Sequence, residues 1–294
     1  MVRSTPKLLS SRRRIFKSLS KLLKSLVCIA ALLGSPTILA DDIPAPRLSL
    51  EKIKASGKLR LAALPEQDSS FLAFDFSVAT PKEQADLEKV PLVGADAEIL
   101  GLLATHLGVE LELVLPEVLT TDGTVGHVAL GKGDIGAGNI SITESRARRV
   151  DFSRSYYTTA LAAVARSDKP IKTLDEAVGK RVAMPAGSAV IAHWRKLMGK
   201  RPYEEVFIDG MTIGIIAAVV DGYADLSIDD EAVMRSMTAD LPAAQITMTL
   251  DIDDHYGFAF PKNSELKAEC DRFLENLEKS GKLAEIIRRH LGTD

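Results

Sequence analysis

The sequence has few of the residues that usually carry covalent chemistry. It contains two cysteines and one tryptophan among 294 residues, and aromatic residues make up only 5%. Cys28 lies in an N-terminal segment that we expect to be removed, so Cys270 would remain alone and no intramolecular disulfide could form. Cys270 shares one helical face with Leu266 and Leu274, which predicts a buried core residue rather than a nucleophile.

Catalytic and metal-binding patterns are also missing. The five histidines, at positions 106, 127, 193, 255 and 290, are scattered and lack metal-ligand spacing. No GxSxG, HExxH or phosphate-binding-loop pattern occurs. The sequence therefore predicts neither a metal nor a cofactor, and it assigns no catalytic residue.

The first 40 residues have the order of an export signal. They hold eight Lys/Arg and no acid, followed by an apolar run at 26–33 and by Ala40 just before Asp41. The run is shorter than the roughly 20 residues that span a bilayer. We expect cleavage near Ala40 and a periplasmic location. Residues 11–17, SRRRIFK, resemble a twin-arginine signal, and an arginine-rich secretory signal is the alternative.

Removal of this signal leaves an acidic chain. It would keep 29 of the 37 basic residues and all 40 acidic residues, a net charge near −11. That charge argues against nucleic acid and anionic membranes as partners. The remaining residues suffice for one large or two modest domains with a core of their own.

Candidate strands alternate with candidate helices from residue 48 onward. Strands are predicted at 58–64, 109–114, 134–138, 161–166, 181–184, 206–208, 224–228 and 256–260. Helices are predicted at 48–57, 97–107, 125–130, 173–178, 188–198, 212–220, from 231 onward and at 264–290. Residues 65–91 are predicted to form a long loop. The alternation indicates an α/β fold, and the pattern restarts after about residue 166.

The segment 134–157, DIGAGNISITESRARRVDFSRSYY, holds the first candidate site. Thr143 is suited to cap a helix that begins at Glu144. Arg146 would then be the third residue of that helix, where the helix dipole disfavours a cation. Arg146 therefore indicates an anionic partner, and a solvated charge run is the alternative.

Two further polar segments stand where a predicted strand ends and a helix begins. In MPAGS, at 184–188, Gly187 permits close approach, and Ser188 is expected to cap a helix whose free N–H groups suit a carboxylate. In LSIDDE, at 226–231, Asp230 could pair with an ammonium group or merely cap the next helix. In α/β sheets ligands gather at such strand ends. One cationic and one anionic site are what a zwitterion requires.

Six segments occur in the order found in family 3 extracellular solute-binding proteins, the periplasmic amino-acid-binding components of ABC transporters. They are LEKIKASGKLRLA, VGADAEILGLLATHLGVELELV, LGKGDIGAGNISITESRARRVDFSRSYY, GKRVAMPAGSAV, DGYADLSIDDEAV and YGFAFPKNSEL. The pattern IT-x-x-R…DFS-x-x-YY is the most specific. The resemblance implies a two-lobe α/β fold of the type II periplasmic-binding-protein kind. Two crossing strands would form the hinge, and the ligand would lie in the cleft.

The resemblance also implies the site and the division of the chain. The implied ligand-binding residues are Asn139, Ser141, Arg146, Gly187, Ser188 and Asp230. Arg146 would bind the α-carboxylate with help from Ser141 and the helix start at 187–188, and Asp230 would bind the α-amino group. Lobe 1 would comprise 45–160 and 255–294, and lobe 2 would comprise 166–250, with crossing strands near 161–166 and 250–256. The expected partners of this monomer are a small-molecule ligand and a membrane permease.

Three aromatic positions depart from the family pattern. Residues 65–71, PEQDSSF, replace a Pro-Phe clamp, Thr120 and Thr121 stand where an aromatic is frequent, and so does Ala95. The ligand therefore stays open, as do two alternatives. One is an enzyme on the same scaffold, similar to exported cyclohexadienyl dehydratases, with the acid residues at 229–231 as candidate acids. The other is a sensor or a partner protein of a periplasmic dehydrogenase system.

Overall fold

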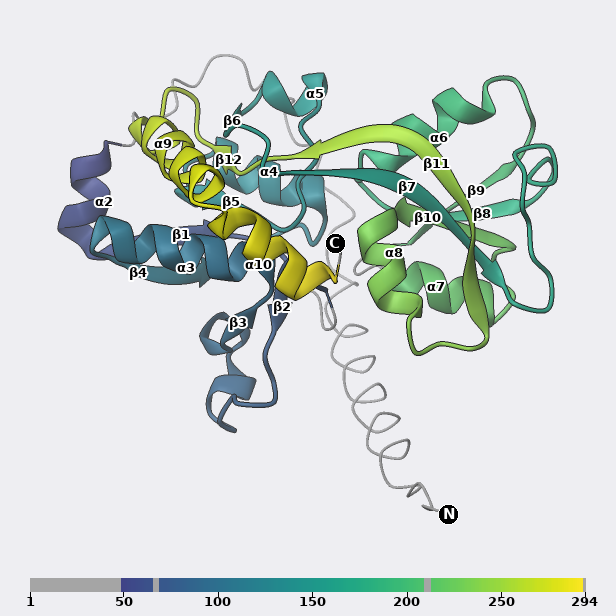
Figure 1. Ribbon diagram of the computed structural model, residues 1–294, viewed down its shortest axis with the longest axis horizontal. Helices are drawn as coiled ribbons and strands as arrows, with labels where there is room; N and C mark the ends of the chain where they lie inside the picture. Colours follow the sequence, from purple (N-terminus) through teal and green to yellow (C-terminus); the bar gives the residue numbers. More distant parts are fainter. Residues whose placement is uncertain (1–48, 66–68, 209–212, 293–294) are drawn as a thin grey trace, which may run out of the picture. The chain divides into compact units, whose positions relative to one another are not determined.

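The computed structural model of the chain describes residues 49–65, 69–208 and 213–292. Two five-stranded β-sheets, each packed against helices, dominate this part of the molecule (Figure 1). The predicted α/β class is therefore confirmed. The export signal expected at 1–40 lies outside the described residues.

The first sheet combines early and late parts of the chain. Its strands are β1 (Lys58–Ala62), β4 (Glu110–Val114), β5 (Ile135–Gly136), β6 (Asp151–Phe152) and β12 (Ala259–Phe260). Their order is β4-β1-β5-β12-β6. The parallel register places Leu61 between Leu113 and Ile135, and all three are buried. β12 pairs antiparallel with β5 and β6, so residues near the C-terminus complete a sheet begun near residue 58.

The second sheet is built from the middle of the chain. Its strands are β7 (Tyr157–Arg166), β8 (Arg181–Pro185), β9 (Glu204–Ile208), β10 (Leu226–Asp230) and β11 (Ala244–Tyr256). Their order is β11-β7-β10-β8-β9. β8 lies parallel to both β9 and β10, whereas β7 is antiparallel to β10 and β11.

β7 and β11 are the strands that lead from one sheet to the other (Figure 1). They pair from Tyr157 opposite Tyr256 to Arg166 opposite Ala244, with two shifts of register between. The sequence predicted two crossing strands but began both too late, since β7 starts at Tyr157 and β11 starts at Ala244. Threonines at 158, 159, 247 and 249 interrupt the apolar pattern of the missed parts.

The described helices largely follow the predicted pattern. They are α2 (Leu50–Ser56), α3 (Ala95–Leu107), α4 (Thr121–Ala129), α5 (Glu144–Ala147), α6 (Val190–Met198), α7 (Ile213–Val220), α8 (Glu231–Thr238), α9 (Glu265–Lys279) and α10 (Lys282–Leu291). α4 begins earlier than predicted because the Thr120 side chain accepts a hydrogen bond from the Gly123 N–H. The helix predicted at 173–178 is wrong, since this segment forms only turns. Gly179, with φ of 71°, ends it before a helix can propagate.

The segment predicted as a long loop contains little regular structure. β2 (Ala73–Phe74) and β3 (Leu92–Val93) form a two-stranded antiparallel pair, and two short 3₁₀ turns, η2 (Glu83–Ala85) and η3 (Leu87–Lys89), lie between them.

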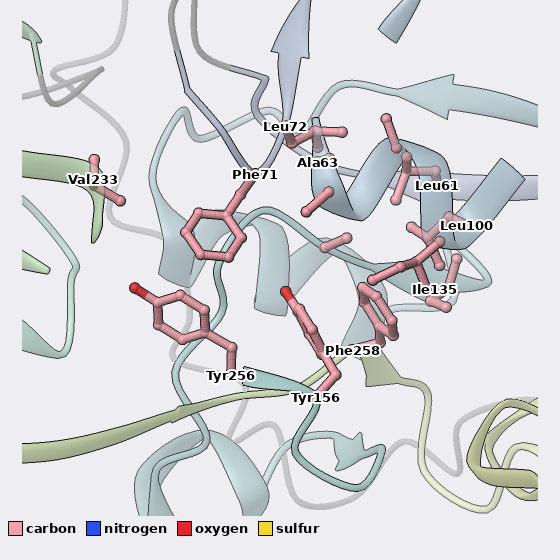
Figure 2. Packing of buried hydrophobic residues seen from close by; sticks show 14 of the residues in the cluster. Leu61, Ala63, Phe71, Leu72, Leu100, Ile135, Tyr156, Val233, Tyr256 and Phe258 are labelled. Atoms are coloured by element: carbon pink, nitrogen blue, oxygen red, sulfur yellow. The ribbon is translucent and has the colours of Figure 1, made fainter. Parts of the chain in front are cut away.

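Aromatic side chains join this segment to the crossing strands (Figure 2). The Phe71 ring lies edge-on to the rings of Tyr157 and Tyr256, with centroids 5.2 Å apart in both pairs. Tyr156 stacks on Phe258 at 4.5 Å. Phe71 therefore packs against the start of β7 and the end of β11. Cys270 is fully buried, as predicted, and burial raises the pKa of its thiol.

Candidate ligand-binding site

A cavity of about 50 Å³ lies where strands of both sheets end. The loop after β5 and the start of α4 line one side, and the residues after β8 and at the end of β10 line the other. Of the predicted site residues, the lining includes Asn139, Ser141, Arg146, Ser188 and Asp230. Gly187 lies between two lining residues, Ala186 and Ser188. The structure thus brings together all three segments selected from the sequence.

Arg146 is buried beside this cavity, with 3% of its surface exposed. Its backbone N–H donates to the Thr143 hydroxyl at 3.2 Å, so the predicted cap of α5 is confirmed. The guanidinium Nε donates to Asp122 Oδ1 at 2.9 Å. The half-exposed Asp122 carboxylate is therefore an anionic partner of the kind that the sequence predicted for Arg146.

The other Arg146 contacts are to backbone carbonyls. Nη1 donates to Ser141 O at 3.1 Å, and Nη2 donates to Gly187 O at 3.2 Å. The second bond crosses from α5 to the segment after β8. Among the described residues, three of the five guanidinium N–H groups have acceptors, which leaves two for a ligand. Arg148, by contrast, is exposed and pairs with Glu144, so the charge-run interpretation fits Arg148 but not Arg146.

The two sides of the cavity approach each other closely at Gly187. Its φ of 70° is in the left-handed region, and a Cβ there would lie 3.2 Å from Thr120 Cβ and Oγ1. A side chain would therefore be strained by the backbone and would also press on Thr120.

Ser188 does not play the capping role that the sequence predicted. The N-cap of α6 is Ala189, and no side chain caps this helix. A turn, in which the Ser188 N–H donates to Pro185 O at 3.3 Å, delays the start of the helix. The Ser188 Oγ is buried in the cavity wall and has no hydrogen-bond partner within the described part of the chain. This hydroxyl is available to a ligand.

Asp230 has the burial of a core residue, with 3% exposed, although it ends a strand at the cavity. It is the N-cap residue of α8, but its side chain makes no capping hydrogen bond, so the capping alternative is wrong. Its Oδ1 lacks a hydrogen-bond partner among the residues that the structure describes. Burial raises the pKa of Asp230 well above its usual range, and the charges of Asp229 and Asp254 add to this. The nearby Tyr256 hydroxyl and Asn139 amide oppose the shift.

Asp254 is a site residue that the sequence analysis missed. It is 3% exposed, and its Oδ2 accepts a 2.7 Å hydrogen bond from the Ser141 hydroxyl. Exposed and buried residues alternate along β11, and Asp254 falls on the buried side with Leu250 and Tyr256. That alternation is the signal that could have identified it. Negative charge is thus concentrated around Asp230.

Asp96 shapes the loop that carries Asn139, and sequence analysis missed this role too. Its Oδ2 accepts hydrogen bonds from the N–H groups of Gly138 at 2.9 Å and Asn139 at 3.3 Å. The Tyr156 hydroxyl donates to its Oδ1 at 2.6 Å. Burial raises the pKa of Asp96 to about 6, against the effect of these hydrogen bonds. Asn139 is held with φ of 45°, a left-handed conformation that asparagine tolerates.

The described residues include neither a metal-binding cluster nor a membrane-spanning helix. No group of three or more His, Cys, Asp or Glu side chains in that part of the chain is placed to hold a metal ion. Residues 49–65, 69–208 and 213–292 also include no helix long and apolar enough to cross a membrane.

Sequence comparison identifies a family and several relatives. Residues 78–293 match the bacterial extracellular solute-binding proteins, family 3. The chain is 26% identical to the ABC transporter glutamine-binding protein GlnH of Bacillus subtilis, over 83% of this chain and 89% of that protein. It is 24% identical to the membrane-bound lytic murein transglycosylase F of Saccharophagus degradans, over 97% of this chain. The chain spans only 54% of the length of that second relative.

Solved structures agree with this assignment. The amino acid ABC transporter substrate-binding protein AbpA of Streptococcus pneumoniae, bound to L-arginine, is 27% identical with a TM-score of 0.70, covering 82% of this chain and 98% of its own. A mutant of ArgBP from T. maritima is also 27% identical with a TM-score of 0.70, covering 83% and 99%. The ancestral protein AncCDT-1, at 23% identity, has the same fold. The protein has the predicted type II periplasmic-binding-protein fold, and it belongs to the bacterial extracellular solute-binding proteins of family 3.

Proposed function

We propose that this protein captures an amino acid, or a related small carboxylate, in the periplasm and delivers it to the permease of an ABC transporter. One observation carries the proposal: the buried Arg146 guanidinium and the buried Asp230 carboxylate, whose Oδ1 has no partner among the described residues, line the same cavity. A zwitterion supplies the opposite charge to each.

The carboxylate end of the ligand would bind at Arg146. Its two remaining N–H groups can donate to a carboxylate, and such charge-assisted bonds are roughly twice as strong as neutral ones. The Ser188 hydroxyl supplies a further donor in the same cavity. Because Asp122 already neutralises part of the guanidinium charge, the ligand carboxylate would compete with it.

The amine end would bind at Asp230. An ammonium group would relieve the cost of holding Asp229, Asp230 and Asp254 close together, because a positive charge favours the ionised form of each. Ser141 uses its proton to bond Asp254, so its oxygen is free to accept from the same ammonium. Both ends of an α-amino acid would then have partners.

Relatives support an amino acid but differ in which one. GlnH is described as glutamine-binding, and AbpA was crystallised with L-arginine. In this chain no aromatic side chain lines the cavity among the described residues, and Thr120, Thr121 and Thr124 stand on one wall. The cavity therefore favours a ligand whose side chain is small or polar.

The remaining parts of the proposal follow from the sequence. The lobes would be 45–160 with 255–294, and 166–250. The chain would be exported by the signal at 1–40, cleaved near Ala40, and would work as a monomer without a metal or cofactor. Family membership supports export, and mass spectrometry of the periplasmic fraction tests the cleavage site.

The experiment that tests the binding function is a thermal-shift screen against the 20 amino acids, polyamines and organic acids, followed by calorimetry. A ligand at 100 times its Kd stabilises the protein by about 2.7 kcal/mol, which raises the Tm by about 5–10 °C. If only compounds that lack either the carboxylate or the amine shift the Tm, the zwitterion assignment is wrong.

One observation favours a second candidate, an enzyme on the same scaffold. The raised pKa of Asp230 is what a general acid in the cleft would need. NMR spectra of a bound compound before and after prolonged incubation separate the two functions. A binding protein returns its ligand unchanged, whereas a dehydratase consumes it.

A further inference from the structure

A second concave region lies on the sheet of β7 to β11, at the end away from the ligand cavity, and has a volume of about 440 Å³. Arg181 begins β8 and Asp225 precedes β10, and both line this region. The ligand cavity lies at Pro185 and Asp230, the opposite ends of the same strands. Five strand residues span about 16 Å, so the two regions are separate.

Positive charge gathers in this second region, which we call the basic pocket. Its lining includes four cationic residues, namely Arg166, Lys169, Lys180 and Arg181. Asp225 is the one carboxylate in that lining. From residue 41 onward the chain carries 29 basic and 40 acidic residues, so this local charge opposes that of the protein.

The two arginines are fixed in place by the chain. Arg181 Nη2 lies 2.9 Å from Asp225 Oδ1, and its Nε donates to Asp225 Oδ2 at 3.1 Å. Arg166 pairs with Asp168 at 2.9 Å and donates through Nη1 to Val220 O at 2.8 Å. Both guanidinium groups therefore form rigid walls of the pocket.

The two lysines differ from the arginines. Lys169 and Lys180 are exposed, and neither ammonium group takes part in a hydrogen bond or ion pair with the described parts of the chain. Each ammonium offers three donors. Pro170 and Ile171 add an apolar wall beside them. The pocket thus combines fixed cations, two available ammonium groups and an apolar surface.

We propose that the basic pocket binds a small multivalent anion with carboxylate or phosphate groups. Both lysines line the pocket, so an anion with two or more charged groups offers a partner to each ammonium, which a monovalent ion does not. The site is independent of the amino acid proposed for the other cavity.

Calorimetry of the purified protein with pyrophosphate and with citrate at low ionic strength tests the site. Saturable binding is expected for one or both anions, and it should weaken as NaCl is added. The variant K169Q/K180Q should bind at least about tenfold more weakly, since two charged donors are lost. The control K196Q/K200Q removes two exposed lysines on and after α6, outside the pocket, and should bind as the wild type does.

Three results would overturn the proposal: no saturable heat with either anion, equal losses in K169Q/K180Q and K196Q/K200Q, or saturable binding of poly-glutamate alone. The last would assign the pocket to an acidic segment of a partner protein. Arg146→Ala should leave anion binding unchanged. Failure at the basic pocket is therefore distinguishable from failure of the amino-acid proposal.

Discussion

The Ser141 hydroxyl donates a 2.7 Å hydrogen bond to Asp254 and so joins the loop after β5 to the crossing strand β11. Both side chains are almost fully buried. A buried carboxylate needs such donors, because water cannot replace them. This hydrogen bond thus holds the loop after β5, which lines the cavity, against β11, one strand of the proposed hinge.

Ser141→Ala should destabilise the protein, because it leaves the buried Asp254 oxygen without its donor. The expected loss is about 1–3 kcal/mol, measured by urea unfolding without ligand. Ser141→Thr keeps the hydroxyl and should recover part of the loss. Ser145→Ala, an exposed position on α5, is the matched control and should change stability by less than about 0.5 kcal/mol. Equal stability of Ser141→Ala and wild type would contradict the role of this bond.

Arg146→Ala should weaken ligand binding by about 30- to several thousand-fold. Removing one partner of a desolvated charge pair costs about 2–5 kcal/mol. Arg146→Lys should recover only part of this, since an ammonium cannot present the planar fork. Arg148→Ala is the control, because Arg148 is exposed and, within the described part of the chain, pairs only with Glu144. Its effect in calorimetry should be a few tenths of a kcal/mol. Equal losses at Arg146 and Arg148 would remove Arg146 from the proposed site.

The cap of α5 and the order of most helices and strands could be predicted from the sequence, because they depend on residues close together in the chain. The Thr143 cap and the position of Arg146 depend on three adjacent peptide units, so the residue types alone predict them. The capping role predicted for Ser188 is wrong. The turn before α6 has no sequence signal that distinguishes its serine from a helix N-cap. Helix and strand order followed from periodicity, which is also local.

The partners within the site could not be predicted in this way. Asp122 meets Arg146 across 24 residues, and Asp96 meets Gly138 across 42. Such contacts depend on which strands are neighbours, and the sequence pattern of each strand does not specify its neighbours. The resemblance to a known family predicted a ligand cleft, but it did not predict that Asp122 and Asp96 would contact the site residues.

Tyr156→Phe should destabilise the protein more at pH 8 than at pH 5. The Tyr156 hydroxyl donates to the buried Asp96 carboxylate, whose pKa is raised to about 6. Above that pH the carboxylate is charged and loses a donor, at a cost of about 1–3 kcal/mol. Below about pH 6 the Asp96 carboxyl is protonated and uncharged, so loss of the Tyr156 hydroxyl costs less stability. The measurement is urea unfolding at both pH values. Tyr157→Phe is the control, because this neighbouring tyrosine is half-buried and its loss should not have the same dependence on pH. A cost that does not change with pH would contradict this account.

Asp230→Asn should stabilise the protein in the absence of ligand at neutral pH. The folded state raises the pKa of Asp230, so the folded protein binds a proton more tightly than the unfolded chain does. Stability therefore falls as the pH rises from the usual pKa towards the raised one, and the cost is complete above it. An amide removes this cost, and each kcal/mol gained raises the Tm by about 2–4 °C. A lower Tm for Asp230→Asn at pH 8 would contradict the prediction.

The affinity for an amine-bearing ligand should fall as the pH is lowered through the raised pKa of Asp230. There the ligand ammonium must displace a proton from the carboxyl, at a cost of up to about 1.4 kcal/mol per pH unit. Asp229, Asp254 and Tyr256 face the same carboxyl and contribute to its raised pKa or its hydrogen bonding, so the proton belongs to the group rather than to one atom.

Calorimetry in buffers of different ionisation enthalpy measures the proton directly. Ligand binding should release up to one proton below the raised pKa and none well above it. Asp230→Asn should flatten the pH profile and weaken amine-bearing ligands more than ligands that lack the amine. Arg146→Ala should lower affinity at every pH without changing the slope, because the slope comes from the proton on the Asp230 carboxyl. A wild-type slope that persists in Asp230→Asn would place the amine elsewhere in the cleft.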